Sequence, residues 1–128
     1  MLVFDGDYQM AYGALDLNRD VTLPLHELRA AESDLSNVPF ASLPEMRKGG
    51  IYCALMKITA RREREDSILP GYRGKEAAHG AARGNLAFYH ALESTGEGRV
   101  ITTGTQLNQL AEQWKQTCLL YTSPSPRD

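Results

Sequence analysis

The chain has 128 residues, of which 42% are apolar, and its formal net charge is −2. This size and composition suit one globular unit, or part of one, better than two domains. A charge so close to zero provides no attraction to nucleic acid or to an anionic membrane, so we expect neither partner. No apolar run approaches the roughly 20 residues that cross a bilayer, and the first residues do not resemble a secretory signal, so we expect a cytoplasmic protein.

The first third of the chain predicts a strand followed by short helices. Residues 2–4 are apolar (Leu-Val-Phe) and should form a buried strand that ends in a polar turn at residues 5–7 (Asp-Gly-Asp). We expect residues 8–20 to be an irregular loop with at most one helical turn. Pro24 suits the first turn of a short helix ending near Glu32, where the loop-forming residues 33–39 begin.

The middle of the chain predicts a second strand. Ser42 with Glu45 has the form of a capping box, and the short helix that it starts should close at the two glycines 49–50. Residues 51–59 (IYCALMKIT) are almost continuously apolar, which is typical of a parallel strand covered on both faces. The mixed charges of residues 61–66 indicate a solvated loop.

Two longer helices are predicted in the last half of the chain. The first spans about residues 75–94, and Gly80 and Gly84 would permit close approach of a neighbour. Its apolar stripe consists of Ala78, Ala82, Leu86, Tyr89 and Leu92. The second begins at a capping box made by Thr103 and Gln106, and its apolar stripe consists of Leu107, Leu110, Ala111 and Trp114.

This order of elements favours an α/β fold. Two strands do not close a parallel sheet, and a complete (β/α)₈ barrel needs about 250 residues, so we expect an incomplete structure. Residues 1–117 form its natural portion. Residues 118–128 (CLLYTSPSPRD) look instead like translated read-through of a sequencing adapter, with a disordered terminus as the alternative.

Residues 4–11 read Phe-Asp-Gly-Asp-Tyr-Gln-Met-Ala, and residues 43–51 read Leu-Pro-Glu-Met-Arg-Lys-Gly-Gly-Ile. Together with residues 18–20, 23–25, 71–73 and 88–93, these segments resemble the membrane (renal) dipeptidase family over about residues 1–115. The members of this family are zinc-dependent. The resemblance implies that the chain is the N-terminal part of a (β/α)₈ TIM-type barrel. It also implies a hydrolase fragment whose intact relatives cleave the amide bond of small dipeptides through metal-activated water.

The candidate site is formed by Asp7 and Gln9. Residues two apart in an extended segment point the same way, so both side chains should reach one point at the end of the first strand. In the family, the matching histidine and aspartate bind the metal pair, whereas this chain has a carboxylate and a neutral amide. Both changes weaken zinc binding, and the family's other ligands lie on later strands. We therefore expect this chain alone to be inactive and assign no catalytic residue within it.

Four alternatives stay open beside this interpretation. On spacing alone, Asp-Gly-Asp is more typical of a solvated turn, and Asp5 more typically caps that turn than supports a metal ligand. The chain is alternatively a non-catalytic relative that has lost its metal ligands, or a small α/β interaction domain that uses the helix over residues 75–94. We expect His26, His79 and His90 to be surface residues, and Cys53 to be a buried apolar one.

Overall fold

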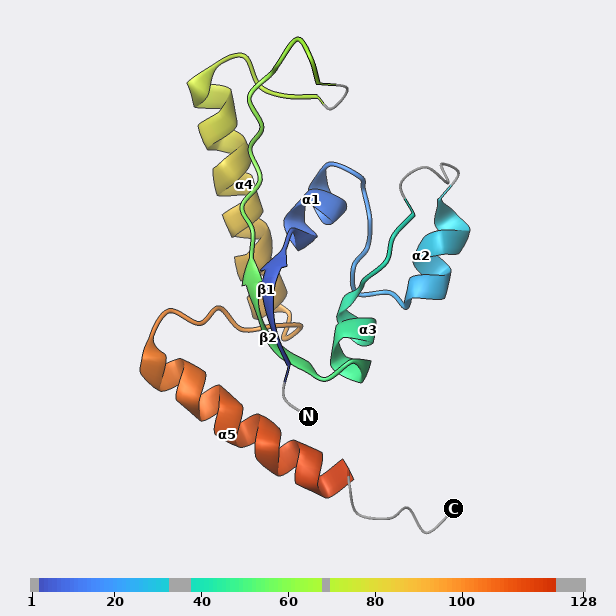
Figure 1. Ribbon diagram of the computed structural model, residues 1–128, viewed down its shortest axis with the longest axis vertical. Coiled ribbons are helices and arrows are strands. Elements are labelled where there is room, and N and C mark those ends of the chain that lie inside the picture. Colours follow the sequence, from blue (N-terminus) through green and yellow to red (C-terminus); the bar gives the residue numbers. More distant parts are fainter. Residues whose placement is uncertain (1–2, 33–37, 68–69, 122–128) are drawn as a thin grey trace.

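The computed structural model describes residues 3–32, 38–67 and 70–121, with side chains as far as residue 116. These residues form a mixed α/β structure with five helices and a two-stranded sheet (Figure 1). The elements are β1 (Val3–Tyr8), α1 (Met10–Leu15), α2 (Leu25–Ala31), α3 (Leu43–Lys48), β2 (Ile51–Met56), α4 (Lys75–Ser94) and α5 (Gly104–Tyr121). The α/β class expected from the sequence is confirmed.

The two strands are parallel, as predicted. Val3 pairs with Ile51 and Tyr8 with Met56, and the register shifts between Asp5 and Tyr8. The predicted polar turn at residues 5–7 is wrong, because this segment stays in the strand and pairs with β2. Polar side chains are tolerated there because they reach solvent; the Asp7 side chain, for example, is 64% exposed.

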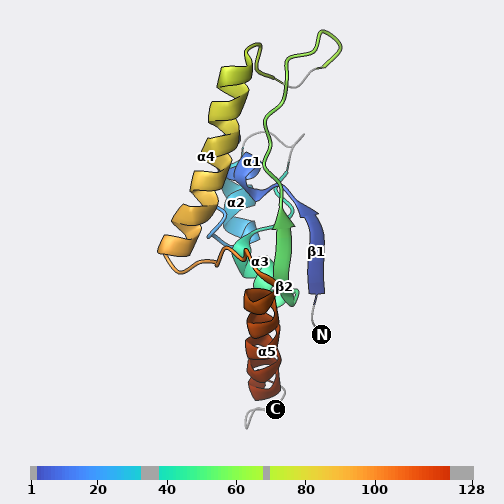
Figure 2. The same cartoon turned by 90° about the vertical axis from the view of Figure 1, so that its left-hand side faces the viewer.

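The helices cover one face of the sheet. Tyr8, Ala54 and Met56 pack against the hydrophobic core, which α1, α3 and α4 supply. In the view of Figure 2, α1, α2 and α4 lie on the β2 side of the strands. Phe4 is 45% exposed and Leu55 is 59% exposed. The prediction of a strand covered on both faces is therefore wrong for the described part of the chain, and β2 ends at Met56 instead of residue 59.

The core joins the short helices to α4. Its buried apolar residues are Met10, Ala11, Val21, Leu43, Met46 and Tyr89. Residues 10–15 form α1 although only an irregular loop with at most one helical turn was expected. An isolated helix of six residues is unstable in water, so α1 depends on its packing against α4. The short helix predicted after Pro24 is confirmed as α2, whereas the loop residues 33–37 lie outside the described part.

Helix α4 has the predicted bounds. Its buried face differs from the prediction at one turn, because Leu86 is 43% exposed while Asn85 is buried. The suggestion that Gly80 and Gly84 admit a close neighbour is also wrong for the described part of the chain, where nothing lies within 4 Å of a Cβ built at either position.

The two predicted capping boxes have opposite outcomes. Ser42 precedes α3, but its buried hydroxyl makes no hydrogen bond to any described residue. Glu45 pairs with Lys48 instead (3.0 Å). The Ser42–Glu45 capping box is therefore wrong. At α5 the Gln106 N–H donates to Thr103 Oγ1 (3.2 Å) and the Thr103 N–H donates to Gln106 Oε1 (3.1 Å), which confirms the second box.

Helix α5 packs by its apolar stripe near the start of β2. Trp114 lies beside Tyr52, with 6.4 Å between ring centroids. The helix backbone extends to Tyr121, into the segment expected to be a tail, and residues 122–128 are outside the described part. Among the described residues, each helix is too short or too polar to span a membrane.

Candidate functional site

The candidate site lies at the carboxyl edge of the sheet. Because β1 and β2 are parallel, their carboxyl ends meet at the same edge. The Lys57 N–H donates to the Tyr8 carbonyl (2.7 Å), which continues the pairing one residue beyond β2. Residues 57–59 therefore run beside residues 7–9, and this edge corresponds to the one on which barrel enzymes build their active sites.

Asp7 and Gln9 both lie at this edge, but each has its own partner. The Lys57 ammonium donates to Asp7 Oδ2 at 2.9 Å, and the two side chains are 47% and 64% exposed, respectively. The Thr59 hydroxyl donates to Gln9 Oε1 at a long 3.5 Å. The structure thus places Asp7 and Gln9 at one edge of the sheet, beside residues 57 and 59. Their side chains contact separate partners instead of converging on one point.

Helix α4 fixes the backbone of the segment that carries Lys57 and Thr59. The Tyr89 hydroxyl donates to the Lys57 carbonyl (2.9 Å) and accepts the Ala11 N–H (3.2 Å). The Asn85 side chain accepts the Thr59 N–H at 3.0 Å. These contacts hold residues 57–59 between α1 and α4, so the partners of Asp7 and Gln9 come from a well-anchored segment.

Burial and local hydrogen bonds determine the electrostatics of the edge. Burial raises the pKa of Tyr89 above its ordinary value, although the hydrogen bond from Ala11 opposes this. Burial likewise raises the pKa of Tyr8, against the lowering effect of the Arg19 charge. The Asp5 carboxylate accepts the Asp7 N–H (3.1 Å), a local contact inside β1 instead of the expected cap of a turn.

A hollow of about 90 Å³ lies behind the edge. Tyr12, Arg19 and Phe40 line it together with Gln9. Arg19 is held by two hydrogen bonds to Glu32 (2.7 and 3.1 Å), which fixes its guanidinium group. Across the edge, the Arg61 guanidinium lies 4.3 Å from the Tyr12 ring centroid. This hollow has room for a few water molecules but falls far below the volume of a usual ligand pocket.

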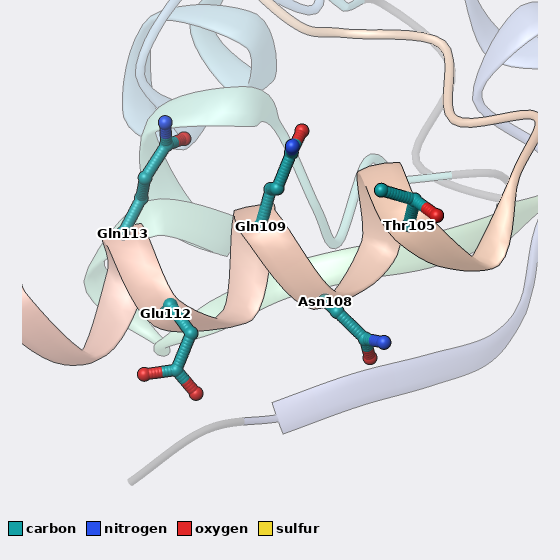
Figure 3. A pocket seen from close by; sticks show the side chains of 5 residues that line it. All are labelled: Thr105, Asn108, Gln109, Glu112 and Gln113. Atoms are coloured by element: carbon teal, nitrogen blue, oxygen red, sulfur yellow. The ribbon is translucent and has the colours of Figure 1, made fainter.

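A second depression lies along α5, far from this edge in sequence. Figure 3 shows that its polar side chains all project from one helix. They are Thr105, Asn108, Gln109, Glu112 and Gln113. A binding cleft needs walls from more than one element to enclose a ligand, so we regard this depression as a solvated helix face.

The residues present do not fit zinc. At the edge, one oxygen of Asp7 is engaged by an ammonium group, and Gln9 offers a neutral amide oxygen. Over residues 3–32, 38–67 and 70–116, no three His, Cys, Asp or Glu side chains come together as a metal-binding group. His26, His79 and His90 are exposed on α2 and α4, as predicted. No catalytic step through a metal is therefore derived for this chain.

Cys53 does not add a nucleophile to the site. Its side chain is half-buried, and burial raises the pKa of its thiol. A thiol with a raised pKa is less often ionised at neutral pH and is therefore less reactive. The prediction of a small apolar residue agrees with this environment, although Cys53 is less buried than expected.

The sequence interpretation missed the four residues that complete the edge. Lys57 and Thr59 interrupt the apolar run of residues 51–59 at the same spacing of two that separates Asp7 and Gln9. This shared spacing indicated that Lys57 and Thr59 would lie beside Asp7 and Gln9 once the two strands paired. Asn85 and Tyr89 act on that segment from α4, and the polar Asn85 lies beside the predicted apolar stripe.

No family model matches this chain, and neither a curated protein nor a solved structure matches it. The resemblance to zinc-dependent dipeptidases therefore depends on the sequence motifs alone and stays a prediction.

Proposed function

We propose that this chain is the N-terminal part of a (β/α)₈ barrel similar to the metal-dependent dipeptidases, and that the chain by itself is inactive. In that setting it supplies the first two strands and one rim of a pocket for a small dipeptide. In this proposal zinc is bound by the intact relatives and not by this chain alone. We also propose that the protein is cytoplasmic.

The observation that best supports this proposal is the position of Asp7 and Gln9. Both lie where two neighbouring parallel strands end, with the helices packed on one face of the sheet. A barrel has the same arrangement: helices cover the outer face, and the pocket is built from residues that follow the carboxyl ends of the strands. The exposed Phe4 and Leu55 side chains then correspond to the face that a closed barrel buries.

The proposed inactivity follows from the chemistry of the same two positions. Zinc sites in enzymes use three or more histidine, cysteine or carboxylate ligands. Here one carboxylate is paired with Lys57 and one ligand is an amide. We therefore expect the purified chain, assayed with excess zinc, to release no amino acid from a panel of simple dipeptides. Turnover that depends on zinc and is abolished by a chelator would contradict this proposal.

The decisive test of the barrel is the sequence of the source locus past codon 117. We expect about 200 further residues, from the usual barrel length, with metal-ligand histidines after later strands. A frame that continues without barrel-like strands would refute the proposed relationship.

A non-catalytic relative is the second candidate, and the Asp7–Lys57 ion pair favours it. A lysine beside a metal position suits a protein that has lost the metal better than one that uses it. The same locus distinguishes the two candidates. Histidine at codon 7 and aspartate at codon 9 would restore the enzyme, whereas confirmed Asp7 and Gln9 without later histidines would establish the non-catalytic form.

A further inference from the structure

We propose that Lys57 is a specificity-determining residue that excludes divalent metal ions from the carboxyl edge of the sheet. Its ammonium group provides the positive charge beside position 7 that a metal would otherwise bring. This inference rests on the proposed correspondence of positions 7 and 9 with metal-ligand positions. It identifies Lys57, directly after β2, as the residue that keeps a metal ion out of that site.

Direct competition for the same oxygen is the first argument. Lys57 Nζ lies 2.9 Å from Asp7 Oδ2, so an ion bound through that oxygen must displace the ammonium group. An ammonium donates hydrogen bonds in several directions and has no acceptor lone pair, so Lys57 cannot join the site as a ligand while it is charged. The pair therefore occupies one of the two carboxylate oxygens that Asp7 would offer.

The second argument is that the backbone of Lys57 is anchored beside position 7. Its N–H donates to the Tyr8 carbonyl (2.7 Å) and its carbonyl accepts the Tyr89 hydroxyl (2.9 Å). Thr59, two residues on, is anchored to Asn85 (3.0 Å). The backbone is thus fixed on both sides, and the charged end of Lys57 stays within reach of position 7 whichever side chain stands there. Two positive charges a few ångströms apart repel each other, so a charge of +1 at this place lowers affinity for a divalent ion.

The test compares zinc affinities of full-length variants by competition with a chromogenic chelator. The double variant Asp7→His with Gln9→Asp restores the two family ligands and keeps Lys57. The triple variant adds Lys57→Met, which removes the charge and preserves much of the side-chain length. We expect the triple variant to bind zinc at least tenfold more tightly than the double variant, and the double variant to bind little better than the parent chain.

Lys48→Met in the double-variant background is the matched control. Lys48 also forms an exposed ion pair, with Glu45 at 3.0 Å, but it precedes β2, at the opposite end of the strand. The control should leave zinc affinity within about twofold of the double variant. Circular dichroism at low temperature checks that every variant keeps the helical content of the parent.

Two results would overturn the inference in different ways. Equal affinity of the double and triple variants above that of the parent, or an equal gain from Lys48→Met, would show that Lys57 does not exclude the ion, while leaving positions 7 and 9 as metal positions. No gain in any variant would refute Lys57 as the excluding residue and would also count against the proposed dipeptidase-like site.

Discussion

Tyr89 joins three elements through one hydroxyl group. Its ring is buried in the core, and the hydroxyl connects the N–H of Ala11 in α1 to the carbonyl of Lys57 after β2. Both backbone groups sit where regular hydrogen bonding stops, at a helix start and a strand end. A single tyrosine thereby satisfies a donor and an acceptor that the local secondary structure leaves unpaired.

We expect Tyr89→Phe to lower the free energy of unfolding by about 1–3 kcal/mol, because the buried Ala11 N–H and the partly buried Lys57 carbonyl lose their partner while the packing is kept. Chemical denaturation followed by circular dichroism measures this difference. Tyr72→Phe is the control, since Tyr72 is exposed and should change stability by less than about 0.5 kcal/mol. Equal effects of the two substitutions would argue against a bridging role for the Tyr89 hydroxyl.

The raised pKa values of Tyr8 and Tyr89 predict a loss of stability in alkali. The unfolded chain releases these protons near the ordinary tyrosine pKa of about 10, whereas the folded chain retains them to higher pH. The stabilisation is therefore complete below about pH 10 and is lost as the pH rises through the folded-state pKa values. As the pH rises from 8 to 11, the denaturation midpoint of the parent chain should fall more steeply than that of the double variant Tyr8→Phe, Tyr89→Phe. Parallel curves would contradict the prediction.

At the scale of elements, α4 organises the described structure. It packs against α1 through the core, and Asn85 and Tyr89 on successive turns hold the segment after β2. Its other side faces solvent, including Leu86 and the helix glycines 80 and 84. A helix with one anchoring face and one free face tolerates changes on the free face.

Gly84→Ala should stabilise the chain by about 0.5–1 kcal/mol, since alanine favours a helix interior and a Cβ at this position meets nothing within 4 Å. Thermal or chemical unfolding of the variant measures the gain. Gly71→Ala is the contrasting change, because its Cβ would meet backbone atoms of Arg62 and Glu63 at 2.5 Å. A destabilised Gly84→Ala variant would indicate a neighbour packed at that position.

At the scale of the whole molecule, the described part of the chain leaves one face of the sheet open, with Phe4 45% exposed and Leu55 59% exposed. Helix α5 adds little cover, because it packs mainly near the start of β2.

We therefore predict that the isolated chain is poorly soluble or melts broadly. A cooperative domain of 128 residues should unfold with an enthalpy of roughly 90 kcal/mol near 60 °C, and we expect less than half of that by calorimetry. Exposed Phe4 and Leu55 should also promote association. A sharp two-state transition of a monomer would refute this prediction and would favour an autonomous α/β interaction domain.

Much of the architecture was predictable because it depends on neighbours in sequence. The bounds of α4, the Thr103–Gln106 cap of α5 and the parallel α/β order all follow from local periodicity, capping chemistry and strand composition. The position of Asp7 and Gln9 at the carboxyl edge was also predictable, because it depends only on the presence and direction of the first strand. These features involve residues within a few positions of each other, where the pattern of side chains fixes the backbone.

The remaining features depend on contacts between distant segments. Strand pairing with β2 kept residues 5–7 extended where the composition indicated a turn, and packing against α4 stabilised α1. Likewise, Lys57 reaches Asp7 across fifty positions of sequence, and Tyr89 reaches Ala11 across seventy-eight. The sequence alone determined the short helices α2 and α3, the longer helices α4 and α5 and the parallel pair of strands, and it placed Asp7 and Gln9 near the end of the first strand. Only the tertiary structure decided the partners of those residues, because burial and strand register bring together groups that no local pattern relates.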